Sequence, residues 1–124
     1  MTIVTYSLQF KKLVEREIRK LELDNGRVPF EDWFESLRDL KLQAAVDSRL
    51  ARIRAGNFGD HKSVGAEVFE LRIHKGPGLR VYYGKQGEEV VILLGGGDKG
   101  TQARDISRAK QMWRQWLEIN KNAT

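Results

Sequence analysis

The stretch "FELRIHKGPGLRVYYGKQGEEVVILL", residues 69–94, contains the pattern of three strands and two turns. Apolar and polar side chains alternate over 68–74 and again over 79–84, which is typical of strands with one buried face. The turn-forming "KGPG" lies between them, and "KQGEE" separates the second strand from "VVILL", a continuous apolar run typical of a strand covered on both faces. The stretch therefore predicts an antiparallel meander.

Helices are predicted on both sides of this meander. Apolar residues recur at helical spacing over 30–37, just after a proline, and a second apolar stripe runs from about residue 40 to a stop at Gly56, so the two segments form a helical hairpin. A last helix, with Thr101 as its cap, follows the meander. The expected fold class is α+β, with the hairpin and the C-terminal helix packed on a mainly antiparallel sheet.

Two N-terminal segments are harder to place. Residues 15–26 fit a helix or a strand by periodicity and end in the turn signal "DNG". Residues 1–14 are either a short helix or a loose extension, so the chain divides into an extension (1–14) and one domain (15–121).

Composition excludes several classes of site. The chain has 124 residues and no cysteine, which rules out disulfides, thiolate metal ligands and a cysteine nucleophile. It has neither an apolar leader nor a stretch of transmembrane length, so a cytoplasmic protein without membrane contact is expected. A net charge of +5 and a pI near 9.6 favour a polyanionic partner, most often nucleic acid.

The positive charge is concentrated in the meander. Residues 71–87 contain Arg72, Lys75, Arg80 and Lys85 and no acid. If the first two strands pair across "KGPG", Arg72, Arg80 and Tyr82 share one face, with Lys75 at its rim. That face is either an ordinary solvated surface, with Glu70 partly neutralising Arg72, or a phosphate-binding surface on which tyrosine stacks a base.

The segment "LLGGGDKGTQARD" (93–105) contains a second candidate, read as a strand, a glycine-rich loop and a helix start. Lys99 precedes Gly100, which is the wrong order for a nucleotide-binding P-loop. Two interpretations remain: a weak anion site at a helix N-terminus beside Lys99, or a tight turn.

The histidines predict no metal site. His61 is expected to be an exposed loop residue, and His74, at the end of a strand that carries Arg72, is a minor candidate for proton transfer or base contact.

Several motifs in order resemble the addiction-module killer toxins, a HigB-like branch of the RelE/ParE superfamily of type II toxin–antitoxin systems. They are "PFEDWFESL", "NFGD", "VFELRI", "GPGLRVYY", "LLGGGDK" and the "Q..DI..A" helix opening, within about residues 15–118. The resemblance implies a RelE-like fold whose first strand lies at 15–23. It also implies a toxin that cleaves mRNA in the ribosomal A site and is neutralised by an antitoxin, often a helix-turn-helix protein.

The resemblance also suggests roles for individual residues. Arg80 corresponds to the family's sheet arginine implicated in cleavage, Arg72 and Lys75 adjoin it, and Lys99 falls near a second basic position. We expect metal-free scission without a cofactor, in which the arginines stabilise the phosphorane and Lys99 or Lys75 acts as general acid or base. The expected RNA contacts are His74, Tyr82, Lys85 and Arg104.

One departure from the family concerns the proton-transfer group. RelE toxins often carry a tyrosine in the last helix or tail, whereas this chain reads "ARDISRA" there, so Tyr82 or Tyr83 is the alternative. Two other functions stay open: a ParE-like gyrase inhibitor without catalysis, and a non-toxic nucleic-acid-binding module.

Overall fold

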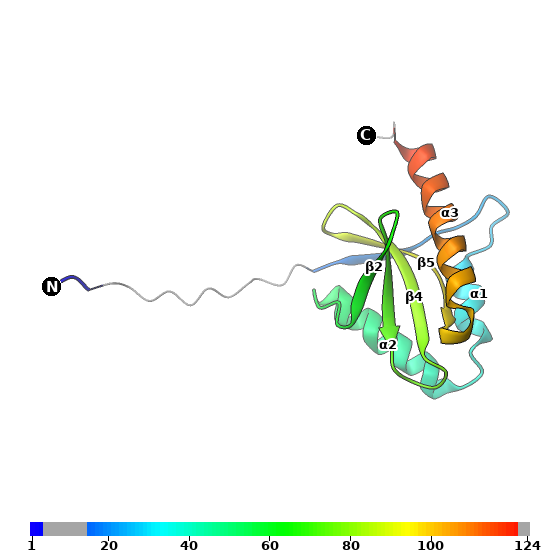
Figure 1. Ribbon diagram of the computed structural model, residues 1–124, viewed down its shortest axis with the longest axis horizontal. Coiled ribbons are helices and arrows are strands. Elements are labelled where there is room, and N and C mark those ends of the chain that lie inside the picture. Colours follow the sequence, from blue (N-terminus) through cyan, green and yellow to red (C-terminus); the bar gives the residue numbers. More distant parts are fainter. Residues whose placement is uncertain (4–14, 122–124) are drawn as a thin grey trace.

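The computed structural model describes residues 1–3 and 15–121. Residues 17–120 form one sheet with helices on both of its faces (Figure 1). In chain order the elements are β1 (Glu17–Lys20), α1 (Pro29–Ser36), α2 (Leu40–Arg54), β2 (His61–Gly65), β3 (Val68–Ile73), β4 (Leu79–Gln86), β5 (Val90–Asp98), a 3₁₀ turn η1 (Lys99–Thr101) and α3 (Gln102–Asn120). The predicted extension over 1–14 lies, apart from residues 1–3, outside the described residues.

The five strands form a mixed sheet in the order β1-β5-β4-β3-β2. The predicted meander is β3, β4 and β5, which pair antiparallel, whereas β1 pairs with β5 in parallel, from Glu17 opposite Val90 to Lys20 opposite Leu93. The ambiguous N-terminal segment is thus a strand. The α+β prediction is confirmed, with three helices packed on a five-stranded sheet.

Strand β2 was not predicted. It pairs with β3 at the sheet edge, and its register shifts between Ser63 and Gly65. Its sequence, HKSVG, is almost entirely exposed and lacks the apolar alternation of a half-buried strand. A short, polar and irregular strand is a common form for a sheet edge, because it discourages pairing with other chains. His61, expected in a loop, is the first residue of this strand.

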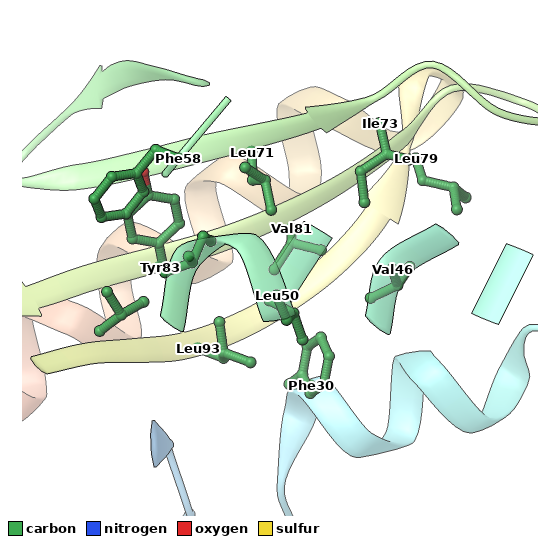
Figure 2. Close-up of a cluster of buried hydrophobic side chains, with 12 residues drawn as sticks. Phe30, Val46, Leu50, Phe58, Leu71, Ile73, Leu79, Val81, Tyr83 and Leu93 are labelled. Atoms are coloured by element: carbon green, nitrogen blue, oxygen red, sulfur yellow. The ribbon is translucent and has the colours of Figure 1, made fainter. Parts of the chain in front are cut away.

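The face of the sheet that α1 and α2 cover holds the larger apolar core, shown in Figure 2. On this face, alternate residues of the strands pack against the inward side chains of both helices, as the spacing of the apolar residues predicted. The buried members are Phe30, Val46, Leu50, Ile53, Phe58, Leu71, Ile73, Leu79, Val81, Tyr83, Val91 and Leu93.

The opposite face packs against α3. Its core contains the intervening strand residues together with Ala109 and Trp113 of the helix. The Trp113 ring lies so close to Gly84 that a Cβ at that position would be 2.5 Å from it, so only glycine fits. Trp113 and Trp116 stack with their ring centroids 5.0 Å apart, consistent with a packing role.

The three consecutive glycines belong to β5 and not to a loop, which corrects the sequence interpretation. Gly95 has φ of +156° at the β4–β5 register shift. A Cβ on Gly96 would overlap the Trp33 ring, and one on Gly97 would overlap the Asp105 carboxylate. Close packing of α1 and α3 on β5 accounts for this glycine run.

Candidate functional site

The two arginines singled out from the sequence lie directly opposite each other. Arg72 on β3 and Arg80 on β4 are Cα partners in the antiparallel register. They alternate with the core residues of the α2 face, so both side chains lie on the face toward α3. The predicted sharing of one face is confirmed.

Arg80 is held next to a buried carboxylate. About 10% of its side chain is exposed, and its Nε lies 3.6 Å from Oε1 of Glu70, which is fully buried. The other Glu70 oxygen accepts hydrogen bonds from Tyr82 Oη at 3.1 Å and from Gln102 Nε2 of α3 at 2.8 Å. Glu70 was expected to neutralise Arg72 in part, and in the structure its partner is Arg80.

The hydrogen-bonding capacity of this pair is only partly used. Within the described part of the chain, Arg80 Nε and Glu70 Oε1 are buried and have no hydrogen-bond partner. Arg80 Nη1 donates to the Leu79 carbonyl at 3.3 Å, a long bond. Arg80 Nε and Glu70 Oε1 lie next to each other, so the contact is an ion pair whose distance is too long for a hydrogen bond.

Arg72 pairs with a different acid, Asp60, which the sequence analysis did not single out. Arg72 Nη2 donates to Asp60 Oδ1 at 2.9 Å, and the pair is about one-third exposed. Arg49 of α2 holds the loop that carries Asp60, because its guanidinium donates to the carbonyls of Phe58, Asp60 and Arg72. Helix α2, on the opposite side of the sheet, thus fixes Asp60 at the edge of the face that carries Arg72 and Arg80. This face is called the arginine face below.

Asp60 also binds His74. His74 Nε2 lies 2.6 Å from Asp60 Oδ2, so one carboxylate joins an imidazole and a guanidinium. The hydrogen bond from His74 lowers the pKa of Asp60 below its ordinary value, burial opposes that change, and Arg72 lowers the pKa further.

This lowered pKa predicts a specific pH dependence of stability. A carboxyl whose pKa is lower in the folded state stabilises the fold above its unfolded pKa, and this contribution is lost as pH falls through the folded value. Wild-type protein is therefore expected to lose more stability than Asp60→Asn between neutral pH and about pH 3. Urea unfolding at a series of pH values measures this, and parallel curves for the two proteins would contradict it.

The two candidate lysines are exposed at the same end of the meander, where Leu79 pairs with Asp98. Lys75 begins the β3–β4 turn, and Lys99 begins η1. A Cβ on Gly78 would lie 3.4 Å from Lys99 Cβ and 3.7 Å from Arg80 Nη1, so Lys99 and Arg80 flank the same glycine. The turn thus brings Lys99 beside Arg80, although 19 residues separate them along the chain, from 80 to 99.

Two of the chain's own acids lie at the start of the last helix, where the sequence suggested an anion site. Asp98 caps η1 by accepting from Gly100 N at 2.7 Å, and Asp105 accepts a hydrogen bond from the Thr101 hydroxyl. Thr101 itself makes no side-chain cap to α3. Thr101 is nonetheless the N-cap residue of α3, as predicted, and the weak anion site stays a prediction.

Two of the predicted RNA contacts are not on the open arginine face. Tyr82 is 1% exposed beneath α3 and cannot stack a base, and its burial, together with Glu70, raises the pKa of its hydroxyl. Lys85 projects to the other side, where its Nζ lies 4.7 Å from the Phe58 ring centroid and 4.6 Å from that of Phe69. Tyr83, the other tyrosine considered for proton transfer, is fully buried in the α2-side core.

Arg104 is exposed on α3 and borders a separate cavity. The cavity has a volume of about 340 Å³ and lies between α1, β5 and α3, with Trp33 and Met112 among its lining residues. The Arg104 guanidinium is 3.5 Å from Asp105 Oδ1. Arg104 therefore belongs to this cavity. The predicted site residues that lie on or next to the arginine face are Arg72, Arg80, His74, Lys75 and Lys99.

Comparison with known proteins identifies a relative. No protein-family model matches the chain. An uncharacterized protein of Haemophilus influenzae is 49% identical over 81 residues, which are 65% of this chain and 82% of that protein. The chain belongs to the family of this Haemophilus protein. This relationship alone assigns no activity, so the chemistry of the site has to be argued from its residues.

Sequence reasoning missed Asp60 and two residues that hold the carboxylates in place, Gln102 and Arg49. Asp60 lies in the quoted "NFGD" motif, and its place one residue before β2 became informative only once that strand was known. Gln102 is the first residue of α3, and its bond to Glu70 joins positions 32 residues apart. Strand alternation indicates which residues share a face, but it does not indicate which loop or helix end lies above them.

Two further findings concern the described part of the chain. No helix among these residues is long and apolar enough to cross a membrane. In residues 1–3 and 15–121 no group of three or more histidine, aspartate or glutamate side chains is arranged to hold a metal ion.

Proposed function

We propose that this protein is the toxin of a type II toxin–antitoxin module, a HigB-like member of the RelE/ParE superfamily that cleaves mRNA on the ribosome without a metal ion. The observation that supports it most strongly is the juxtaposition of Arg72 and Arg80, which are direct partners on neighbouring strands. Guanidinium groups match phosphate oxygens in shape and charge, and two of them side by side suit a phosphodiester.

The carboxylates beside the arginines are compatible with this role. Asp60 and Glu70 hold the guanidinium groups in place before substrate arrives, so little side-chain freedom is lost on binding. They also reduce the net positive charge of the site. A partly neutralised site binds free RNA weakly, which fits an enzyme that relies on the ribosome to position its substrate.

The proposed reaction is transesterification within the RNA. The 2′-oxygen attacks the adjacent phosphorus, a bond forms between them, and the bond from phosphorus to the 5′-oxygen breaks. Arg72 and Arg80 stabilise the charge that develops on the phosphorane oxygens, and such electrostatic stabilisation is worth about 10² to 10³ in rate for one donor. Lys99, beside Arg80, is placed to protonate the leaving oxygen, and Lys75 at the turn is the alternative.

The proposal includes a RelE-like fold, a cytoplasmic location and a cognate antitoxin. The antitoxin is expected to be a helix-turn-helix protein with an acidic or apolar segment, because the protein carries a charge of +5 and exposes Lys75 and Lys99. Messenger RNA on the ribosome is the proposed substrate, and no cofactor is invoked.

A second candidate is a gyrase inhibitor of the ParE type, which binds without catalysis. It is favoured by the limited exposure of Arg80 and by the ion pairs of both arginines, since a binding surface needs no free guanidinium. A non-toxic nucleic-acid-binding module would be consistent with the same two ion pairs, Arg72–Asp60 and Arg80–Glu70.

Controlled expression in bacteria tests the proposal. Induction of the full chain is expected to arrest growth and to produce new mRNA ends at codon-spaced positions, mapped by primer extension. Purified protein is expected to cut mRNA on programmed ribosomes equally well with and without EDTA. Growth arrest with intact mRNA and inhibited gyrase supercoiling would support the second candidate instead, and absence of growth arrest would contradict both toxin functions.

A further inference from the structure

The pairing of His74 with Asp60 suggests a function for the histidine. The imidazole is largely exposed, with 71% of its side-chain surface accessible, yet its Nε2 lies 2.6 Å from Asp60 Oδ2. A hydrogen bond this short to a carboxylate is charge-assisted and holds the ring in one orientation.

The same carboxylate relates the histidine to the arginine face. Asp60 Oδ1 binds Arg72 and Asp60 Oδ2 binds His74, so the imidazole and the guanidinium lie on either side of a single carboxylate. Arg72 is in turn the direct strand partner of Arg80. A phosphate held between the two arginines would therefore have the imidazole nearby.

The hydrogen bond also determines which ring nitrogen is available. When a neutral imidazole donates from Nε2 to a carboxylate, its Nδ1 carries the free lone pair. Within residues 15–121, Nε2 is the His74 nitrogen that bonds to protein, and Nδ1 has no partner. This is the logic by which an aspartate fixes the tautomer of a catalytic histidine.

We infer that His74, oriented by Asp60, is the general base that takes the proton from the RNA 2′-hydroxyl. The inference rests on the proposed ribonuclease function and names the proton acceptor for it. The 2′-hydroxyl proton moves to His74 Nδ1 as the bond from the 2′-oxygen to phosphorus forms. The 5′-oxygen leaves with its bonding electrons and takes a proton from the Lys99 ammonium, giving a 2′,3′-cyclic phosphate and a 5′-hydroxyl. Asp60 acts as a positioning residue.

Several charged groups surround His74. Asp60 comes from the loop before β2, Arg72 from β3 and Lys75 from the following turn, and Arg49 of α2 holds the Asp60 loop through its carbonyls. Asp60 is an acid, and the other three residues are cations. The diagnostic result is the acid limb of the rate profile, which is the fall in cleavage rate at low pH. A His74 variant should lose this fall. The pH at which the wild-type rate is half-maximal is not used as the criterion.

Single-turnover cleavage of mRNA on programmed ribosomes tests the inference with the full chain. His74→Gln is expected to lower the rate constant by about 10²- to 10³-fold and to remove the acid limb of its pH profile. His74→Ala is expected to regain activity when imidazole is added. Asp60→Asn is expected to reduce the rate less and to shift the pH profile, as a positioning role requires. Circular dichroism of each variant checks that it is folded.

His61→Gln is the matched control. His61 is also exposed, lies next to Asp60 in the chain and has a ring nitrogen 2.9 Å from the Gly59 carbonyl, but it makes no bond to Asp60. Its variant should cleave at the wild-type rate. A folded His74→Gln that cleaves at the wild-type rate would overturn the inference and leave the proposed function intact. Loss of affinity alone, without imidazole rescue, would also overturn it. Wild-type protein that cleaves no RNA would overturn both.

Discussion

Replacement of Arg80 by lysine is expected to reduce mRNA cleavage on programmed ribosomes by at least about 10²-fold while the protein stays folded. The lysine keeps a positive charge near Glu70, so the buried carboxylate is not left without a counter-charge. It lacks the planar fork of donors that matches phosphate oxygens, and its single ammonium cannot serve Glu70 and a phosphorane together. The measurement is a single-turnover rate, accompanied by a thermal unfolding midpoint.

The matched control for this substitution is Arg19→Lys. Arg19 is also a strand arginine paired with a glutamate, Glu17, but it lies on β1 at the far side of β5 and is more than half exposed. Cleavage should be unchanged in that variant. A well-folded Arg80→Lys protein with the wild-type rate would show that Arg80 is a structural residue, and the proposed mechanism would then lack its main electrostatic group.

The largest effect on stability is expected at Glu70. Glu70→Leu leaves the Arg80 guanidinium buried beside an apolar side chain and removes the acceptor of both Tyr82 and Gln102. Loss of one partner of a buried ion pair costs about 3 to 5 kcal/mol. Because small domains are stable by only about 5 to 15 kcal/mol, the variant should lose a large fraction of its free energy of unfolding. Urea unfolding at 25 °C measures the change.

A double variant separates the charge effect from the packing effect. Glu70→Leu combined with Arg80→Leu removes both charges, and part of the lost stability should return, since an apolar pair often replaces a buried ion pair at little cost. Glu17→Gln, which breaks an exposed pair, should unfold at the wild-type urea concentration. A Glu70→Leu protein as stable as the wild type would show that the buried network does not hold α3 to the sheet.

The sequence predicted the parts of the fold that depend on local pattern. Alternation over 68–74 and 79–84 correctly placed Arg72 and Arg80 on one face, and helical spacing correctly identified α1, α2 and α3. Period-two and period-3.6 patterns record burial along a single element, so they are visible without tertiary structure. These patterns do not identify the element that covers each face.

The errors have the same origin. The run of three glycines resembled a loop because glycine usually marks one, whereas here Trp33 and Asp105 leave no space for a Cβ on Gly96 and Gly97. Tyr82 occupied a polar position in the alternation, yet α3 covers it and gives it Glu70 as a partner. Lys85 was counted with the arginines from charge alone, although strand parity assigns it to the opposite face.

The parallel pairing of β1 with β5 joins strands from opposite ends of the described chain. Glu70 likewise gains its bond from Gln102 only after the first residue of α3 has been added. A nascent polypeptide consequently remains without a finished sheet, and without its full set of contacts around Arg80, until β5 and the first residue of α3 have been synthesised. The order of synthesis by itself delays maturation of the arginine face until well after its two arginines have been added.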